Sequence, residues 1–121
     1  MHGKTHWYIP DAYLPSSGLG EFWEGHESVC VLNAGTVDAT LTFTFFFANR
    51  DPIENVTVVV PARRDRHLGL HKPEDFDGLL LPRDVPYGIG IESDQPVIVQ
   101  YSRLDVTQPN FTLMTTIPFS V

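Results

Sequence analysis

The stretch Thr40-Leu41-Thr42-Phe43-Thr44-Phe45-Phe46-Phe47 decides the fold class of this chain. Its apolar residues recur at every second position with threonines between them, which predicts a strand with one apolar face and one threonine face. Similar alternation, or a shorter β-branched run, recurs at Ser28–Leu32, Val56–Val60, Tyr87–Ile91, Val97–Tyr101 and Phe111–Phe119. Because no window of useful length shows the 3.6-residue period, we expect little or no helix.

Turn-forming residues separate these runs. Clusters of Asn, Asp, Gly and Pro stand at Asn33–Gly35, Asn49–Pro52 and Ser93–Pro96, where we predict turns. Seven or eight short strands joined in this way are typical of an all-β sandwich or barrel, and we predict an antiparallel β-sandwich. A chain of 121 residues fits one such domain, spanning residues 1–121.

Two segments do not fit as strands, and loops of their length are often functional. They are Pro10–Glu27, rich in glycine, and His71–Pro86, which contains Leu79-Leu80-Leu81. We expect the leucines to cap one end of the sandwich or to enter a subunit contact. Together with Phe76 they lead us to predict a homo-oligomer, because one small core cannot cover so much apolar surface.

Charge and cysteine content narrow the class of protein. The chain has 8 basic and 15 acidic residues, a net charge of -7, which disfavours nucleic-acid and anionic membrane surfaces. The start of the chain lacks the pattern of a signal peptide, and its apolar runs fall far short of the ~20 residues of a membrane span. A single cysteine, Cys30, permits no intramolecular disulfide, so we expect a cytoplasmic protein.

No motif predicts catalysis or cofactor binding. The sequence has no Gly-x-Ser-x-Gly elbow, phosphate-binding glycine loop or dinucleotide fingerprint. We expect both sheets to cover Cys30 and to leave its thiol inert, with a raised pKa. His67 and His71 stand about 13 Å apart along a regular strand, too far to bind one metal ion. We predict no enzyme, cofactor or metal, although a pair of acids for glycoside hydrolysis stays open.

Three polar stretches are candidates for binding. The basic stretch Arg63–His67 can hold a carboxylate or phosphate, or pair with the acids of this chain. Gln100 lies in the middle of an apolar run and needs a hydrogen-bond partner if it is buried. Arg103 and Asp105 either form a structural ion pair or face a ligand.

Aromatic residues collect in the first long loop. Tyr13, Phe22 and Trp23 stand there with acidic residues between them. Flat rings beside carboxylates suit sugars, whose C–H faces stack on the rings. The same rings also suit a protein interface or a small satellite core beneath the loop.

Several unusual stretches resemble the sensory rhodopsin transducer family, in collinear order over nearly the whole chain. The matching segments are Trp7, Tyr13–Pro15, His26–Gly35, Val60–Arg64 with His67, Pro96–Asp105 and Thr115–Ile117. The chain departs from the family pattern at Gly18–Gly25 and at His71–Pro86. The resemblance implies a β-sandwich that assembles as a homotetramer, stays in the cytoplasm and carries signals by binding, without catalysis.

The resemblance also implies a partner and a set of site residues. The founding partner is a membrane photoreceptor, touched at its cytoplasmic face, although related chains occur in bacteria that lack such a receptor. The polar residues that match the family form our candidate site: His26, Glu27, Asn33, Arg63, Arg64, His67, Gln100, Arg103 and Asp105. In this interpretation the arginines hold an anionic or hydroxyl-rich group, the amides add hydrogen bonds, and the first two residues orient the ligand.

An alternative interpretation is a small protein like a carbohydrate-binding module, linked to sugar metabolism. The family fold is similar to such modules. In that case Tyr13, Phe22 and Trp23 form the stacking platform for the sugar.

Overall fold

The computed structural model describes residues 2–16, 26–107 and 110–121, and it is almost entirely β. Its strands are β1 (Lys4–Tyr13), β2 (His26–Asn33), β3 (Ala39–Phe47), β4 (Ile53–Val60), β5 (Arg64–Gly69), β6 (Pro86–Asp105), β7 (Thr112–Thr116) and β8 (Phe119–Ser120). One 3₁₀ turn, η1 (Pro73–Asp75), joins β5 to β6. Among the described residues, no helix is long and apolar enough to cross a membrane.

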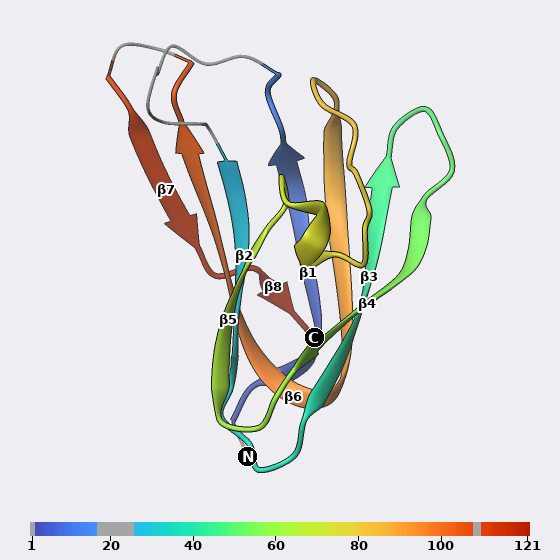
Figure 1. The fold of residues 1–121 in the computed structure, drawn as a ribbon, viewed down its shortest axis with the longest axis vertical. Helices are drawn as coiled ribbons and strands as arrows, with labels where there is room; N and C mark the ends of the chain where they lie inside the picture. The colour runs from blue at the N-terminus through green and yellow to red at the C-terminus, as the bar shows by residue number, and fades with distance from the viewer. Residues whose placement is uncertain (1, 17–25, 108–109) are drawn as a thin grey trace.

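The strands form two antiparallel layers that share β6. The first layer has the order β4-β3-β6-β1-β8, and the second has β5-β2-β6-β7. The first half of β6 pairs with β1 and β3, and its second half pairs with β2 and β7. Figure 1 shows β6 bending at the lower end of the molecule and rising again in the other layer. The predicted all-β sandwich is confirmed.

The turn predicted at Ser93–Pro96 is wrong, because these residues form the bend inside β6. The polar side chains satisfy the backbone at the bend. Ser93 Oγ donates to the Gln95 carbonyl at 2.6 Å, and Asp94 Oδ1 accepts from the Thr40 amide at 2.8 Å. Residue types that usually end a strand can therefore also bend one, because a turn and a bend both leave backbone N–H and C=O groups that side chains can hydrogen-bond.

Two other expectations about the strands need correction. The first loop is shorter than predicted, because β1 continues through Pro10 to Tyr13. The run Phe111–Phe119 is not one strand, since β7 pairs with β6 whereas β8 pairs with β1. Pro118 separates β7 from β8, and a proline nitrogen has no hydrogen to donate to a ladder.

The second long loop covers part of the open upper end of the sandwich (Figure 1). Phe76, just after η1, is buried and meets the ring of Phe43 edge-on at 5.1 Å between centroids. Leu81 is buried as well, and Leu79 packs against the core. Only Leu80 of the three leucines is well exposed, at 72%. Of the two expectations for the leucines, the structure shows the cap on the sandwich, and the leucines supply little exposed surface for a subunit contact.

Cys30 lies on the outer face of the second layer, so the expectation that both sheets cover it is wrong. Its neighbours Val29 and Val31 point into the core, whereas Cys30 is half-buried between His67 and Gln100 of the adjacent strands. Partial burial, followed by the charge of Asp65, raises the pKa of the thiol. The predicted direction of the pKa shift is therefore confirmed, and burial is still its main cause although it is only partial.

We predict that a thiol reagent labels Cys30 slowly at neutral pH in buffer and quickly in denaturant. Asp65→Asn should speed the native reaction, because removing the negative charge lowers the thiol pKa and increases the thiolate fraction. Asp51→Asn, in the exposed β3–β4 turn, is the matched control. Labelling rates measured by absorbance test this; equal rates for Asp65→Asn and the parent chain would refute the role of that charge.

Candidate functional site

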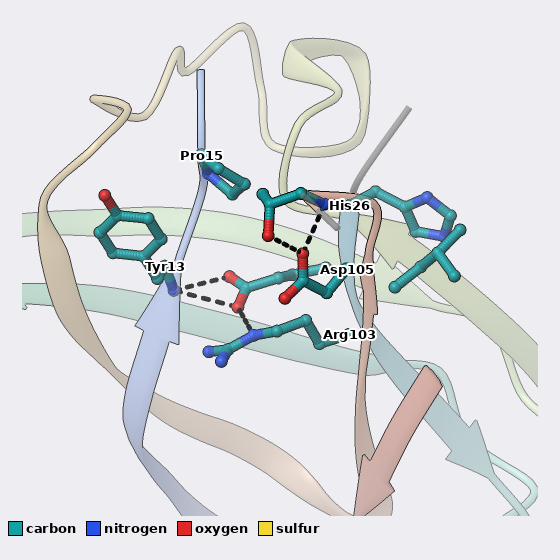
Figure 2. A pocket seen from close by; sticks show the side chains of 8 residues that line it. Tyr13, Pro15, His26, Arg103 and Asp105 are labelled. Carbon is teal, nitrogen blue, oxygen red and sulfur yellow. Dashed lines mark hydrogen bonds and ion pairs between the residues drawn. The ribbon is translucent and has the colours of Figure 1, made fainter. Parts of the chain in front are cut away.

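A small hollow at the open end of the sandwich gathers four of the predicted site residues. Its volume is about 130 Å³, and it is lined by Tyr13, Pro15, His26, Glu27, Arg103, Leu104, Asp105 and Thr107. Figure 2 shows the hollow between the end of β1 and the strands of the second layer.

Strand register explains why these residues meet. β2 begins where β6 ends, so His26 lies opposite Leu104 and Glu27 opposite Arg103. The end of β1 approaches from the first layer, and the Tyr13 amide points toward Glu27 (Figure 2). Segments far apart in the sequence thus contribute side chains to one hollow.

The carboxylate of Glu27 is buried, with 1% of the residue exposed, and is surrounded by donors. The Tyr13 amide donates to both of its oxygens, at 2.9 and 3.0 Å. The hydroxyl of Tyr87 donates at 3.1 Å, the hydroxyl of Tyr101 donates to the other oxygen, and Arg103 Nε donates at 2.7 Å. A buried charge is tolerated only with such pairing and hydrogen bonding, which this site provides.

Arg103 pairs with Glu27 and Asp11, so the predicted ion pair with Asp105 is wrong. Its Nη2 lies 3.6 Å from Asp11 Oδ1 and donates to the Tyr101 hydroxyl at 3.2 Å. Asp105 instead accepts from the side chain and backbone of Thr107, at 2.6 and 2.8 Å, and these two bonds lower the pKa of the Asp105 carboxyl. Arg103 therefore ties the two layers together.

The same cluster shifts the pKa of its tyrosines and of Arg103. Burial, then the charge of Glu27 and the hydrogen bond to it, raise the pKa of Tyr87 far above its ordinary value. Burial and the same carboxylate also raise the pKa of Tyr101. For Arg103, burial lowers the pKa, but the hydrogen bonds to Tyr101 and Glu27 outweigh it, so the pKa rises. Both phenols and the guanidinium keep their protons at neutral pH.

Three predicted residues lie at the opposite end of the sandwich. Asn33, the last residue of β2, is about 23 Å along the strand from His26. It is buried and structural: Nδ2 donates to the carbonyls of Val37 and Val60 at 2.9 and 3.0 Å. Arg63 and Arg64 are exposed nearby. Arg63 and Arg64 are therefore too far from Arg103 to bind the same small ligand.

The remaining predicted residues lie in the middle of the second layer's outer face. His67 is exposed and bonds Asp65 at 3.0 Å, and Gln100 is exposed and donates to Thr115 Oγ1 at 2.8 Å. The nine residues thus fall into three groups. Of the aromatic platform, Tyr13 lines the hollow, whereas Phe22 and Trp23 lie outside the described residues.

Sequence reasoning missed the two buried tyrosines of the cluster. Tyr87 and Tyr101 each share the parity of the apolar residues in their runs, so they read as core residues. The one available signal was Glu27 itself, because it precedes a buried strand and needs donors if it is covered.

The lining of the hollow combines the guanidinium of Arg103 with the carboxylates of Glu27 and Asp105. Arg103 uses Nε and Nη2 for its contacts within the described residues, which leaves Nη1 for an oxygen of a ligand. Among the described residues, no three His, Cys, Asp or Glu side chains are grouped so that they could hold a metal ion.

We predict that Glu27→Ala lowers the free energy of unfolding by about 3–5 kcal/mol, because it removes the acceptor that the half-buried guanidinium of Arg103 shares with two buried phenols. Glu54→Ala, at an exposed position of β4, should change it by no more than about 0.5 kcal/mol. Urea denaturation followed by circular dichroism measures both. A loss below about 1 kcal/mol for Glu27→Ala would contradict the role given to this carboxylate.

A second prediction concerns alkaline pH. The unfolded chain releases its phenol protons near pH 10, whereas the raised pKa values of Tyr87 and Tyr101 hold these protons in the folded protein. The unfolded state then binds fewer protons, so stability falls as pH rises above about 10, by up to about 2.7 kcal/mol per pH unit for the pair. In the double variant Tyr87→Phe/Tyr101→Phe, this slope should flatten in pH-dependent denaturation; an unchanged slope would refute it.

Comparisons with known proteins agree with this architecture. Residues 2–120 match the family described as Anabaena sensory rhodopsin transducer. The crystal structure of Thermotoga maritima 1070 has 37% sequence identity and a TM-score of 0.87, covering 100% of this chain and 97% of that one. The structure of the Anabaena sensory rhodopsin transducer has 36% identity and a TM-score of 0.74, covering 85% of this chain and 97% of that one. No curated protein matches the chain. This chain therefore belongs to the Anabaena sensory rhodopsin transducer family.

Proposed function

We propose that this chain is a cytoplasmic signal-transducing protein that acts by non-covalent binding as a homo-oligomer, with residues 1–121 as one domain and no catalysis of its own. Its membership of a transducer family supports the signalling role. The observation that carries the binding role is an exposed apolar edge formed by β7, β8 and the residues that flank them.

This edge, which we call the C-terminal edge, exposes large apolar side chains. They are Leu113 at 72%, Met114 at 39%, Ile117 at 61%, Phe119 at 65% and Val121 at 60%. Every residue of β7 is exposed, although the strand is paired along one side with β6. Apolar surface gathered in this way marks an interaction site more often than a solvated face.

The occupant we propose for the C-terminal edge is a second copy of the chain. Natural sheets protect an open edge strand with charges, prolines or bulges, because its free N–H and C=O groups can pair with another strand. Residues 106–121 carry no charged side chain, and β7 itself contains no proline. Pairing of two copies of β7 would satisfy the edge and bury these side chains. A homotetramer is the assembly we propose.

The partner we propose is the cytoplasmic face of a membrane receptor, of which a microbial rhodopsin is the leading example. The name of the Anabaena relative supports this class of partner. Cytoplasmic loops of membrane proteins are rich in Lys and Arg, so they attract a protein with a net charge of -7. Anionic lipid headgroups repel the same charge, which favours the receptor loops over the bare membrane.

The hollow beside Arg103 is the proposed site for a small anionic or hydroxyl-rich ligand. It lies at the open end, away from β8, with one arginine nitrogen available among the described residues. The carbohydrate platform at Tyr13, Phe22 and Trp23 stays a prediction, since two of its rings lie outside the described residues.

The oligomer has a direct test at the C-terminal edge. We predict a mass of several chains for the parent protein in size exclusion with light scattering. The variant Leu113→Glu/Ile117→Glu should run as a single chain, because two buried carboxylates would oppose strand pairing. Leu80→Glu places a charge at a leucine that is equally exposed but lies far along the chain, and it should leave the mass unchanged. A single-chain mass for the parent protein would contradict the proposal.

The partner has a separate test. A purified sensory rhodopsin in lipid nanodiscs should bind the parent protein in a calorimetric titration, with an affinity that falls as salt is added. Empty nanodiscs of the same lipids are the control. If the protein is oligomeric but binds neither the rhodopsin nanodiscs nor the empty ones, the proposed oligomer stands and the proposed rhodopsin partner is refuted.

A further inference from the structure

A second hollow lies at the upper end of the first layer, where the turn after β3 meets the segment that leads into β6 (Figure 1). Its volume is about 210 Å³, larger than that of the hollow beside Arg103. The residues that line it are Phe47, Ala48, Asn49, Arg50, Pro82, Val85 and Pro86. None of them lines the hollow beside Arg103. We call this second site the Arg50 hollow.

The two walls of the Arg50 hollow are held in place by the fold. Phe47 of β3 lies opposite Tyr87 of β6, and their ring centroids are 6.2 Å apart. The segment before β6 is bonded to the chain that follows β1, from the Asp84 amide to the Leu14 carbonyl at 2.8 Å, from the Ser16 amide to Asp84 Oδ1 at 2.8 Å and from Arg83 Nη1 to the Pro15 carbonyl at 2.9 Å. A hollow that is already formed needs little ordering when a ligand binds.

The lining has an apolar side and a side that donates hydrogen bonds. Two prolines and Val85 form one wall, whereas the turn after β3 contributes the amide of Asn49 and the guanidinium of Arg50. The Arg50 guanidinium carbon lies 4.9 Å from the centroid of the Phe47 ring, and the ring attracts the cation at this distance. Among the described residues, no acid forms an ion pair with Arg50. Its N–H groups can therefore donate to a ligand.

The charge of the lining selects for an anion. Arg50 carries the single formal charge among the lining residues, whereas the hollow beside Arg103 also contains the carboxylates of Glu27 and Asp105. In a chain with a net charge of -7, a hollow with one guanidinium and no acid is a local exception. One guanidinium matches one carboxylate, because the two planar groups form a pair of parallel N–H···O bonds.

We propose that the Arg50 hollow binds a small aromatic monocarboxylate. The carboxylate accepts from Arg50 and Asn49, and the aromatic ring rests against Phe47 and the proline wall. An apolar cavity of about 150 Å³ holds a benzene ring, so the volume here suits one ring with its carboxylate, whereas drug-sized ligands need about 300 Å³ or more. This site goes beyond the binding roles proposed above and does not depend on them.

The experiment is an amide NMR titration of the parent protein at neutral pH with benzoate and with phenylacetate. At least one of these acids should cause saturable shifts centred on Ala48–Arg50 and Val85. Benzyl alcohol, which lacks the charge, and acetate, which lacks the ring, should each bind at least roughly tenfold more weakly, as expected from the loss of a charge-assisted hydrogen bond or of a buried ring.

Matched variants test the residues of the Arg50 hollow. Arg50→Gln should weaken binding of the acid by roughly tenfold or more, whereas Arg64→Gln, at an exposed arginine of β5, should leave it unchanged. Val85→Glu places a carboxylate in the lining and should weaken binding by a similar factor. Val59→Glu adds the same charge at a similarly exposed valine of β4 and should have no effect. Amide spectra of each variant report whether it is folded.

Five results would overturn the proposal. They are the absence of saturable shifts with both acids, shifts centred instead on the hollow beside Arg103, equal affinity for benzyl alcohol, an unchanged affinity in folded Arg50→Gln, and a changed oligomer mass in that variant. The last result would assign Arg50 to a subunit contact. Because Leu113→Glu/Ile117→Glu should bind the acid as the parent chain does, failure of the oligomer and failure of the Arg50 hollow are distinguishable.

Discussion

The buried carboxylate of Glu27 is the contact on which the open end of the sandwich depends. It accepts hydrogen bonds from the first layer, through Tyr13 and Tyr87, and from the second layer, through Tyr101 and Arg103. At the other end the bend of β6 carries one strand from layer to layer, whereas at this end the layers are connected by loops, and the Glu27 cluster supplies direct side-chain contacts between them (Figure 1). The cluster stabilises one arrangement of the two layers, because moving any donor away leaves the buried charge of the Glu27 carboxylate without one of its hydrogen bonds.

The shared strand β6 and the Glu27 cluster constrain each other. Because β6 supplies Tyr87 near its start and both Tyr101 and Arg103 near its end, the bend at Ser93–Gln95 must bring these positions back to one height. The hollow beside Arg103 follows from this return. Glu27 and Arg103, which bond to each other within the structural cluster, also line this hollow.

The proposed function assigns binding to two surfaces, and they differ in chemistry. The hollow beside Arg103 is small and combines one guanidinium with the carboxylates of Glu27 and Asp105, whereas the C-terminal edge is apolar and carries no charged side chain. They occupy an end and an edge of the sandwich, so one chain has room for a small ligand and a second copy at once. A protein that transmits a signal by binding needs such separate surfaces, since coupling requires at least two sites.

The sequence by itself determined the all-β class, the sandwich and most strands, because a period of two over Leu41–Phe47 or Val56–Val60 fixes which side chains enter a core. It could not determine the bend of β6, since Ser93–Pro96 contains the residue types of an ordinary turn. It named Glu27 and Arg103 individually but paired Arg103 with Asp105, the neighbour in sequence. Only the tertiary structure set Glu27 opposite Arg103 and Asn33 at the far end, because strand register across two layers depends on contacts between residues dozens of positions apart.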